Sequence, residues 1–135
     1  MATKVFINLP VKDLNRSKTF FEGLGYSFNP QFTDENAASM VVSDTIFVML
    51  LTENYFKTFT KKPISDAKAS TEVLIALDAA SRDEVQQTIS KAQSLGATIY
   101  NEPADHGWMY QHSFADPDGH QWEFVYMDET QFPNQ

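Results

Sequence analysis

The sequence predicts an α+β fold in which two β-α-β-β-β modules form one curved mixed sheet, with the helices on its outer face. Two stretches have the 3.6-residue apolar period of an amphipathic helix, and several others alternate apolar and polar residues as half-buried strands do. The order of one strand, one helix and three strands occurs twice along the chain. This repetition indicates paired modules within a single domain, residues 1–135.

The first module is expected over residues 4–51. Its first strand has Val5, Ile7, Leu9 and Val11 on one face and Phe6, Asn8 and Pro10 on the other. Asp13 then caps a short amphipathic helix over 14–24, and Gly25 allows the helix to stop. Further extended segments are expected at 26–32, 39–42 and 46–51.

A linker over 52–70 separates this module from the second, which is expected over 71–128. Strand character returns at 71–77. Ser81 with Glu84 three residues later is typical of a capping box, and the helix that follows ends before Gly96. Three more strands are expected at 97–100, 108–114 and 121–127.

The two modules also match in detail. Leu24-Gly25-Tyr26 corresponds to Leu95-Gly96-Ala97 at the helix exits, and Ser43-Asp44 corresponds to Pro117-Asp118 at the last turns. Met49 therefore lies as far beyond Asp44 as Glu123 lies beyond Asp118.

Composition excludes several classes of function. The sequence has no cysteine, which excludes disulfides, thiolate zinc sites and a cysteine nucleophile. A formal charge of −8 argues against nucleic acid as a partner, because phosphate binding requires clustered Lys and Arg. No apolar run is long enough to span a membrane, and a cytoplasmic location is expected.

The stretch from Asp116 to Gly119 is expected to form a tight turn before the last strand. Trp122, Phe124 and Tyr126 then alternate with Gln121, Glu123 and Val125. One face of this strand can pack against a core while the other presents the Glu123 carboxylate. Glu123 is therefore the first candidate for a functional residue.

This turn and strand resemble the vicinal oxygen chelate superfamily, which contains lactoylglutathione lyases (glyoxalases), extradiol dioxygenases and bleomycin-resistance proteins. The family segment D-P-D-G-x-x-x-E is matched from Asp116 to Glu123, and the stretch from Leu9 to Leu14 resembles the family's first strand and helix entry. The resemblance covers roughly residues 4–128. It implies the cup-shaped fold and a homodimer, which the aromatic residues Tyr55, Phe56 and Phe59 support weakly.

Metal-dependent members carry a ligand in the first and last strand of each module, and the resemblance carries these positions onto Phe6, Met49, Glu72 and Glu123. Phe has no lone pair to offer, and a Met thioether is too soft for the metals of this family. A two-residue turn would place His112 opposite Glu123 as a third polar group, whereas a bulge would turn it away. The expected cup is mostly apolar: Phe6, Asn8, Phe47, Met49, Glu72, Leu74, Trp108, Tyr110, His112 and Glu123.

Three functions fit this cup. The first is a small-molecule-binding protein of the bleomycin-resistance type, which holds its ligand between Phe6, Asn8, Phe47, Met49, Trp108 and Tyr110 and needs no metal. The second is a lyase similar to lactoylglutathione lyase, with Glu72 or Glu123 as the catalytic base. The third is a metalloenzyme of dioxygenase type, whose divalent metal is bound by Glu72, His112 and Glu123. A self-satisfied buried network of these three residues is the purely structural alternative.

Overall fold

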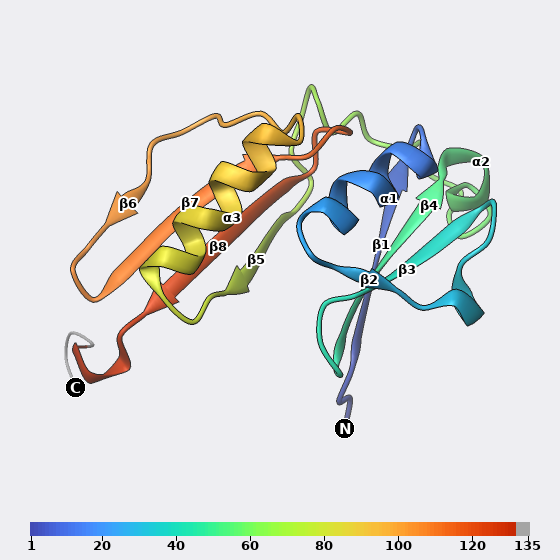
Figure 1. Cartoon of the computed structure of the whole chain (residues 1–135). Helices are drawn as coiled ribbons and strands as arrows, with labels where there is room; N and C mark the ends of the chain where they lie inside the picture. Colours follow the sequence, from blue (N-terminus) through green and yellow to red (C-terminus); the bar gives the residue numbers. More distant parts are fainter. Residues whose placement is uncertain (132–135) are drawn as a thin grey trace. The chain divides into compact units, whose positions relative to one another are not determined.

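The computed structural model describes residues 1–131. The chain divides into two compact units, with the boundary between Asp66 and Ala67 inside the expected linker. The elements of the first unit are β1 (Val5–Val11), α1 (Leu14–Gly23), β2 (Ser27–Phe28), η1 (Pro30–Phe32), β3 (Ala37–Val41), β4 (Ile46–Thr52) and α2 (Glu53–Phe56). Those of the second are β5 (Leu74–Asp78), α3 (Arg82–Ser94), β6 (Ala104–Asp105), β7 (Met109–Ala115), β8 (Gln121–Met127) and η2 (Glu129–Gln131) (Figure 1).

The two units have the same strand order. In the first the order is β1-β4-β3-β2 and in the second β5-β8-β7-β6. Each sheet is mixed, because its first strand runs parallel to its last strand and the other pairs are antiparallel. These observations confirm the predicted α+β class and the paired β-α-β-β-β modules. Where one curved sheet was expected, the hydrogen-bonded ladders form two sheets of four strands each.

Both long helices begin at the predicted caps. The Asp13 carboxylate accepts a hydrogen bond from Arg16 N at 3.1 Å, and Ser81 Oγ accepts one from Glu84 N at 3.0 Å. Each bond satisfies a backbone donor that the first turn of a helix leaves unpaired. The Glu84 carboxylate also accepts a hydrogen bond from Ala80 N, one residue before the cap.

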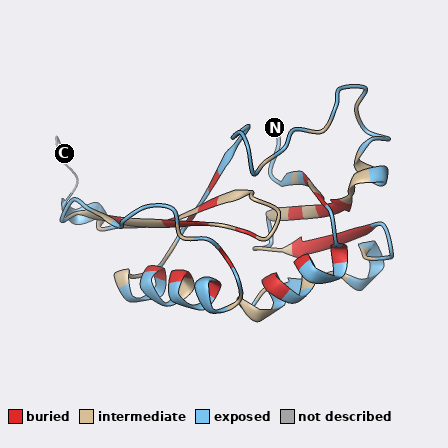
Figure 2. Cartoon of the chain, turned by 90° about the horizontal axis from the view of Figure 1, so that it is seen from above, coloured by how far each residue is buried: buried red, intermediate tan, exposed pale blue. Residues whose placement is uncertain are grey.

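Each long helix packs against one face of its own sheet, and the core of each unit lies between them (Figure 2). Alternate residues of β1 and β4, among them Leu9, Val11, Val48 and Leu50, are buried with Phe20 and Phe21 of α1. In the second unit, Ile75, Leu77, Phe114, Trp122 and Phe124 are buried with Val85 and Ile89 of α3. We call the opposite side of each sheet its open face.

The expected strand at 97–100 is reduced to a single bridge. Thr98 and Ala115 exchange two backbone hydrogen bonds, at 2.9 and 2.8 Å, and the chain pairs with β7 again only at Ala104 and Asp105. The sequence between them contains Pro103, which has no N–H to donate to a ladder. The expected extended segment 26–32 contains only the two-residue strand β2 followed by η1. The other predicted strand ends lie within three residues of the observed ones, as with β5, which begins at Leu74 rather than at residue 71.

Asp116 organises the turn before β8. Its buried carboxylate accepts hydrogen bonds from Asp118 N at 2.9 Å, His120 N at 3.0 Å and Trp122 Nε1 at 3.0 Å. Asp116 N donates to His120 O, so the loop that joins the strands has three residues, 117–119. Gly119 closes it with φ of +93°, a conformation typical of the third residue of such loops. Burial raises the pKa of Asp116, and the charge of His120 and the hydrogen bond from the Trp122 indole offset part of this rise.

Among the described residues, no helix is long and apolar enough to cross a membrane.

We expect Gly119→Ala to destabilise the protein more than Gly96→Ala. A Cβ at Gly119 would lie 2.8 Å from Lys68 N and 2.9 Å from the carbonyl carbon of Ala67, whereas one at Gly96 would meet nothing within 4 Å. Both glycines have a left-handed φ, so the conformational cost is shared and the difference measures the steric clash. The difference in free energy of unfolding should be roughly 1–3 kcal/mol by urea denaturation. Equal losses would show that the segment 67–68 does not pack on this turn.

Candidate functional site on the open faces of the sheets

The open face of the first sheet carries an aromatic pair. Phe6 and Phe47 are register partners in the parallel ladder of β1 and β4, and their rings stack with centroids 5.1 Å apart and planes 14° from parallel. Lys4 Nζ lies 5.9 Å from the centroid of Phe47, within the range of a cation–π contact. Phe6 is 58 % exposed. A ring exposed this far is available to stack against a ligand.

Asn8 and Met49 are the next partners of the same ladder, on the same face as Phe6 and Phe47. The four residues predicted to contact a ligand from the first module therefore do lie together. Farther along this face Leu51 is buried, where α2 packs against β1 and β4. The accessible part of the face thus includes two rings, one amide and one thioether.

In the second unit the three-residue loop sets a register that differs by one from the expected register. Glu123 pairs with Ser113, and His112 pairs with Phe124. The prediction that His112 lies opposite Glu123 is therefore wrong. Because side chains alternate across a strand, a shift of one residue turns every side chain of β7 to the other face. His112 instead lies on the α3 side, where its Nε2 is 3.0 Å from the carbonyl oxygen of Asn101.

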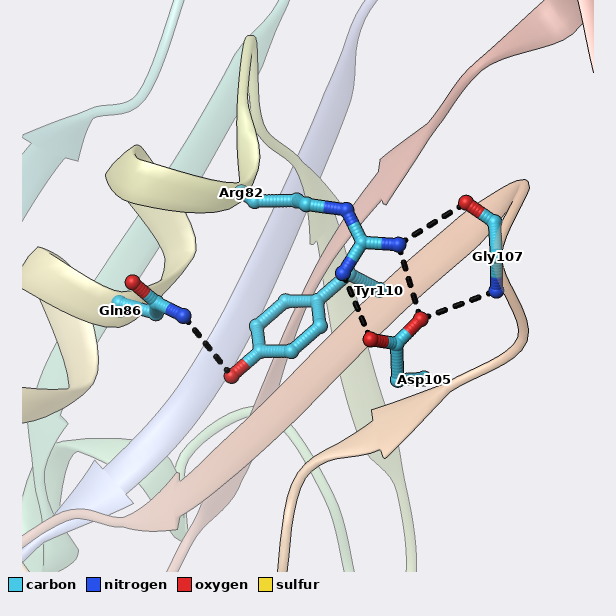
Figure 3. A network of polar contacts seen from close by, with 5 residues as sticks. All are labelled: Arg82, Gln86, Asp105, Gly107 and Tyr110. Carbon is cyan, nitrogen blue, oxygen red and sulfur yellow. Dashed lines mark hydrogen bonds and ion pairs between the residues drawn. The ribbon is translucent and has the colours of Figure 1, made fainter.

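The same shift corrects the expected roles of Trp108 and Tyr110 as ligand contacts on the open face. Tyr110 is buried on the α3 side and takes part in a polar network (Figure 3). The Arg82 guanidinium lies 5.2 Å from the centre of its ring, and Gln86 Nε2 lies 3.5 Å from its hydroxyl. Trp108 precedes β7 and is half-buried, and its carbonyl oxygen accepts a hydrogen bond from Asp128 N at 2.7 Å.

Arg82 is the centre of a polar network within the second unit (Figure 3). Arg82 donates two hydrogen bonds to the Asp105 carboxylate, at 2.7 and 2.8 Å, and a third to Gly107 O at 2.9 Å. These bonds and the one from Gly107 N hold the pKa of Asp105 well below its ordinary value. Arg82 therefore ties α3 to β6 and to the loop before β7.

The open face of the second sheet holds a carboxylate without a basic neighbour. The residues on this open face are Leu74, Ala76 and Asp78 of β5, Met109, Gln111, Ser113 and Ala115 of β7, and Gln121, Glu123, Val125 and Met127 of β8. Glu123 is half-buried, and its direct partners in the two ladders are Ala76 and Ser113. The prediction that β8 presents Glu123 on the face opposite Trp122 and Phe124 agrees with this register.

Sequence reasoning missed Ser113. It is 1 % exposed, and its Oγ has no hydrogen-bond partner among the described residues. The signal was present in the turn, because a glycine at the third loop position favours a three-residue loop over a two-residue one. With that loop, counting outward from the turn places Ser113 opposite Glu123.

The residues present do not fit the family's divalent metal site. In the first sheet Met49 pairs with Asn8, and in the second sheet Glu123 pairs with Ala76, so Asn8 and Ala76 are equivalent positions of the two modules. Two residues earlier, Leu74 is therefore the equivalent of Phe6. Glu72 is not. Glu72 is exposed and precedes β5. Three of the four corresponding positions thus hold Phe6, Met49 and Leu74, which lack the hard donors that such metals need. No group of three His, Asp or Glu within residues 1–131 could hold a metal ion.

A polar cleft of about 490 Å³ lies near the turn of the second unit, between the segment 67–71, the stretch 96–100 and the start of β8. Thr71 Oγ1 donates to Gln121 Oε1 at 2.6 Å within its wall. The cleft is lined by none of the residues predicted to contact a ligand or metal.

Comparisons with known proteins identify the class of fold. Residues 3–43 match the family model described as "Bleomycin resistance protein-like N-terminal". No curated protein sequence matches the chain.

Solved structures match almost the whole chain. A hypothetical protein from S. aureus is 27 % identical, covers 93 % of this chain and 95 % of its own, and has a TM-score of 0.78. A glyoxalase/bleomycin resistance protein/dioxygenase family enzyme from Burkholderia phytofirmans is 13 % identical, with coverages of 90 and 96 % and a TM-score of 0.77. The fosfomycin resistance protein FosX from Mesorhizobium loti is 16 % identical, with coverages of 97 % for both chains and a TM-score of 0.70. The chain therefore has the glyoxalase-like fold of the vicinal oxygen chelate superfamily.

We expect Asp105→Asn to make the melting temperature of the protein less dependent on pH in the acidic range. The folded state lowers the pKa of Asp105 below its unfolded value, near 3.8, so the ion pair with Arg82 contributes stability above that pH and loses it as the pH falls. The melting temperature of the wild type should therefore fall more steeply between about pH 5 and pH 3 than that of the variant. Asp44→Asn, at an exposed turn residue, should keep the steep profile. Parallel profiles for wild type and Asp105→Asn would show that the pair is not formed in solution.

Proposed function

We propose that the chain is a small-molecule-binding protein of the glyoxalase/bleomycin-resistance type that works without a bound metal. The ligand contacts are Phe6, Asn8, Phe47 and Met49 on the open face of the first sheet. The proposal concerns binding of an apolar or aromatic compound, not a reaction.

One observation carries this proposal. The first-strand position at which the family resemblance implies a metal ligand holds Phe6, an apolar side chain that is 58 % exposed and stacks on Phe47. Exposing such groups costs free energy, because apolar surface remains in contact with water. Burying them against a ligand recovers that free energy, which is why exposed apolar groups in a cluster indicate a binding surface.

The stacked rings of Phe6 and Phe47 favour an aromatic ligand. Phe6 and Phe47 present parallel rings, and an aromatic ligand gains offset-stacking or edge contacts from them beyond the area that it buries. Structures with a similar fold include fosfomycin resistance proteins, which supports a drug-sized compound as the class of ligand. The metalloenzyme alternative would need Glu72 and His112 beside Glu123, whereas Glu72 precedes β5 and His112 lies on the α3 side; the lyase alternative keeps Glu123 as its only candidate base.

We expect Phe6→Ala and Phe47→Ala each to weaken binding of the neutral aromatic probe 1-naphthalenemethanol by about 2- to 10-fold, the factor that corresponds to loss of one aromatic contact. Isothermal titration calorimetry measures the affinity. Phe32→Ala is the matched control, because Phe32 is similarly exposed but lies in η1, outside the sheet. Treatment of the protein with EDTA should leave the affinity unchanged. A probe that binds wild type and both variants equally, or only after metal is added, contradicts the proposal.

We also propose a homodimer, whose interface includes the aromatic pair Tyr55 and Phe59. The rings meet edge to face with centroids 5.1 Å apart, and Phe59 is 61 % exposed. Aromatic side chains are enriched in the buried centre of protein interfaces. We therefore expect a dimer in sedimentation velocity at high micromolar concentration and a shift toward monomer for Phe59→Ser, whereas Tyr100→Ser should sediment like the wild type. A wild-type monomer under these conditions contradicts the dimer.

A further inference from the structure

Lys4 places a cationic group at one end of the aromatic pair Phe6 and Phe47. It immediately precedes β1, and residues two apart in an extended chain share a face, so Lys4 lies in line with Phe6 and Asn8 on the open face of the first sheet. The Lys4 Nζ lies 5.9 Å from the centroid of the Phe47 ring. This contact shows that the Lys4 side chain is turned toward the two rings.

Among the described residues, the Phe47 ring is the only partner of the Lys4 ammonium. Within residues 1–131 the ammonium forms no hydrogen bond or ion pair, and Asp44, in the turn before β4, is not bonded to it. A cation–π contact leaves the three N–H donors of an ammonium without acceptors, because a ring face offers no lone pair. Lys4 is exposed, so these donors are available to an anionic group of a ligand.

Among the described residues, none of the ladder positions on the open face of the first sheet is acidic. Besides the two rings, these positions hold Asn8 and Pro10 of β1, Met49 and Leu51 of β4, Ala37, Ser39 and Val41 of β3, and Ser27 of β2. Residues 1–66 contain seven basic and seven acidic residues, so the formal charge of −8 arises entirely from residues 67–135. An anion on this face therefore meets Lys4 without an excess of negative charge from the first unit.

We infer that the ligand of this face is an aromatic carboxylate, with its ring stacked against Phe6 and Phe47 and its carboxylate on the Lys4 ammonium. This inference rests on the proposed small-molecule binding and adds the charge of the ligand and a specificity-determining residue, Lys4. An exposed ion pair contributes little free energy by itself. The rings therefore supply most of the affinity, and Lys4 selects among aromatic compounds by their charge.

Three probes with the same ring system test the charge of the ligand. They are 1-naphthaleneacetate, which is ionised at pH 7, its neutral isostere 1-naphthaleneacetamide, and 2-(1-naphthyl)ethylamine, which is cationic at pH 7. In isothermal titration calorimetry at low salt, the wild type should bind the carboxylate about 2- to 5-fold more tightly than the amide, and the amine most weakly. High salt should reduce this preference, because salt screens an exposed ion pair.

Lys4→Gln should remove the preference, so that the carboxylate and the amide bind equally, whereas Lys4→Arg keeps the charge and should retain it. Lys18→Gln is the matched control, because it removes the same charge from α1, which packs against the other face of the sheet. This control should keep the wild-type preference. Phe6→Ala should weaken all three probes by a similar factor, since each of them stacks through the same ring system.

Equal affinity of the wild type for the carboxylate and the amide would overturn the inference. So would a preference that Lys4→Gln and Lys18→Gln reduce to the same extent, because the effect would then come from net charge alone. In either case the proposed function survives if the amide still binds and loses affinity in Phe6→Ala, whereas failure of every probe to bind removes both.

Discussion

The Asp116 carboxylate sets the geometry of the second sheet. It accepts three N–H donors from within the next six residues, and this fixes a loop of three residues between β7 and β8. A loop one residue shorter would exchange the two faces of β7, bringing His112 to the open face and hiding Ser113. One buried group in a turn thus decides which side chains lie beside Glu123, several residues away along the strand.

The open faces suggest how this chain departs from metal-dependent proteins with the same fold. The register leaves Glu123 as the one hard donor among the four corresponding positions, and the others are aromatic, aliphatic or thioether. A single carboxylate cannot hold a divalent cation tightly. The binding proposed for the first sheet depends on stacking rather than on coordination.

Two polar clusters of the second unit illustrate different uses of charge. Around Arg82 three N–H donors have acceptors, two on Asp105 and one on Gly107 O, so the network ties one helix to a loop and a short strand. Around Ser113 the donors and acceptors exceed the partners that the sheet supplies. An unsatisfied buried hydroxyl of this kind costs free energy in the folded state.

The sequence by itself determined the modules, the helix caps and the alternation within each strand. These features depend on local rules: Asp13 and Ser81 bond to the first turn of the helix that they precede, and a period of two sends Phe6 and Asn8 to one side of β1 and Leu9 to the other. The sequence also placed Glu123 on the face of β8 opposite Trp122, because the alternation of side chains within one strand does not depend on its partners.

Only the tertiary structure decided which residues of different strands meet. Register across a turn depends on loop length, and the choice between two and three residues rested on Asp116, whose bonds to His120 N and Trp122 Nε1 form only when the turn folds against the sheet. Spacing along the chain likewise placed Glu72 at the position that the parallel ladder gives to Leu74. Pairing between strands is a non-local property, so the residues beside Glu123 became known only from the ladders themselves.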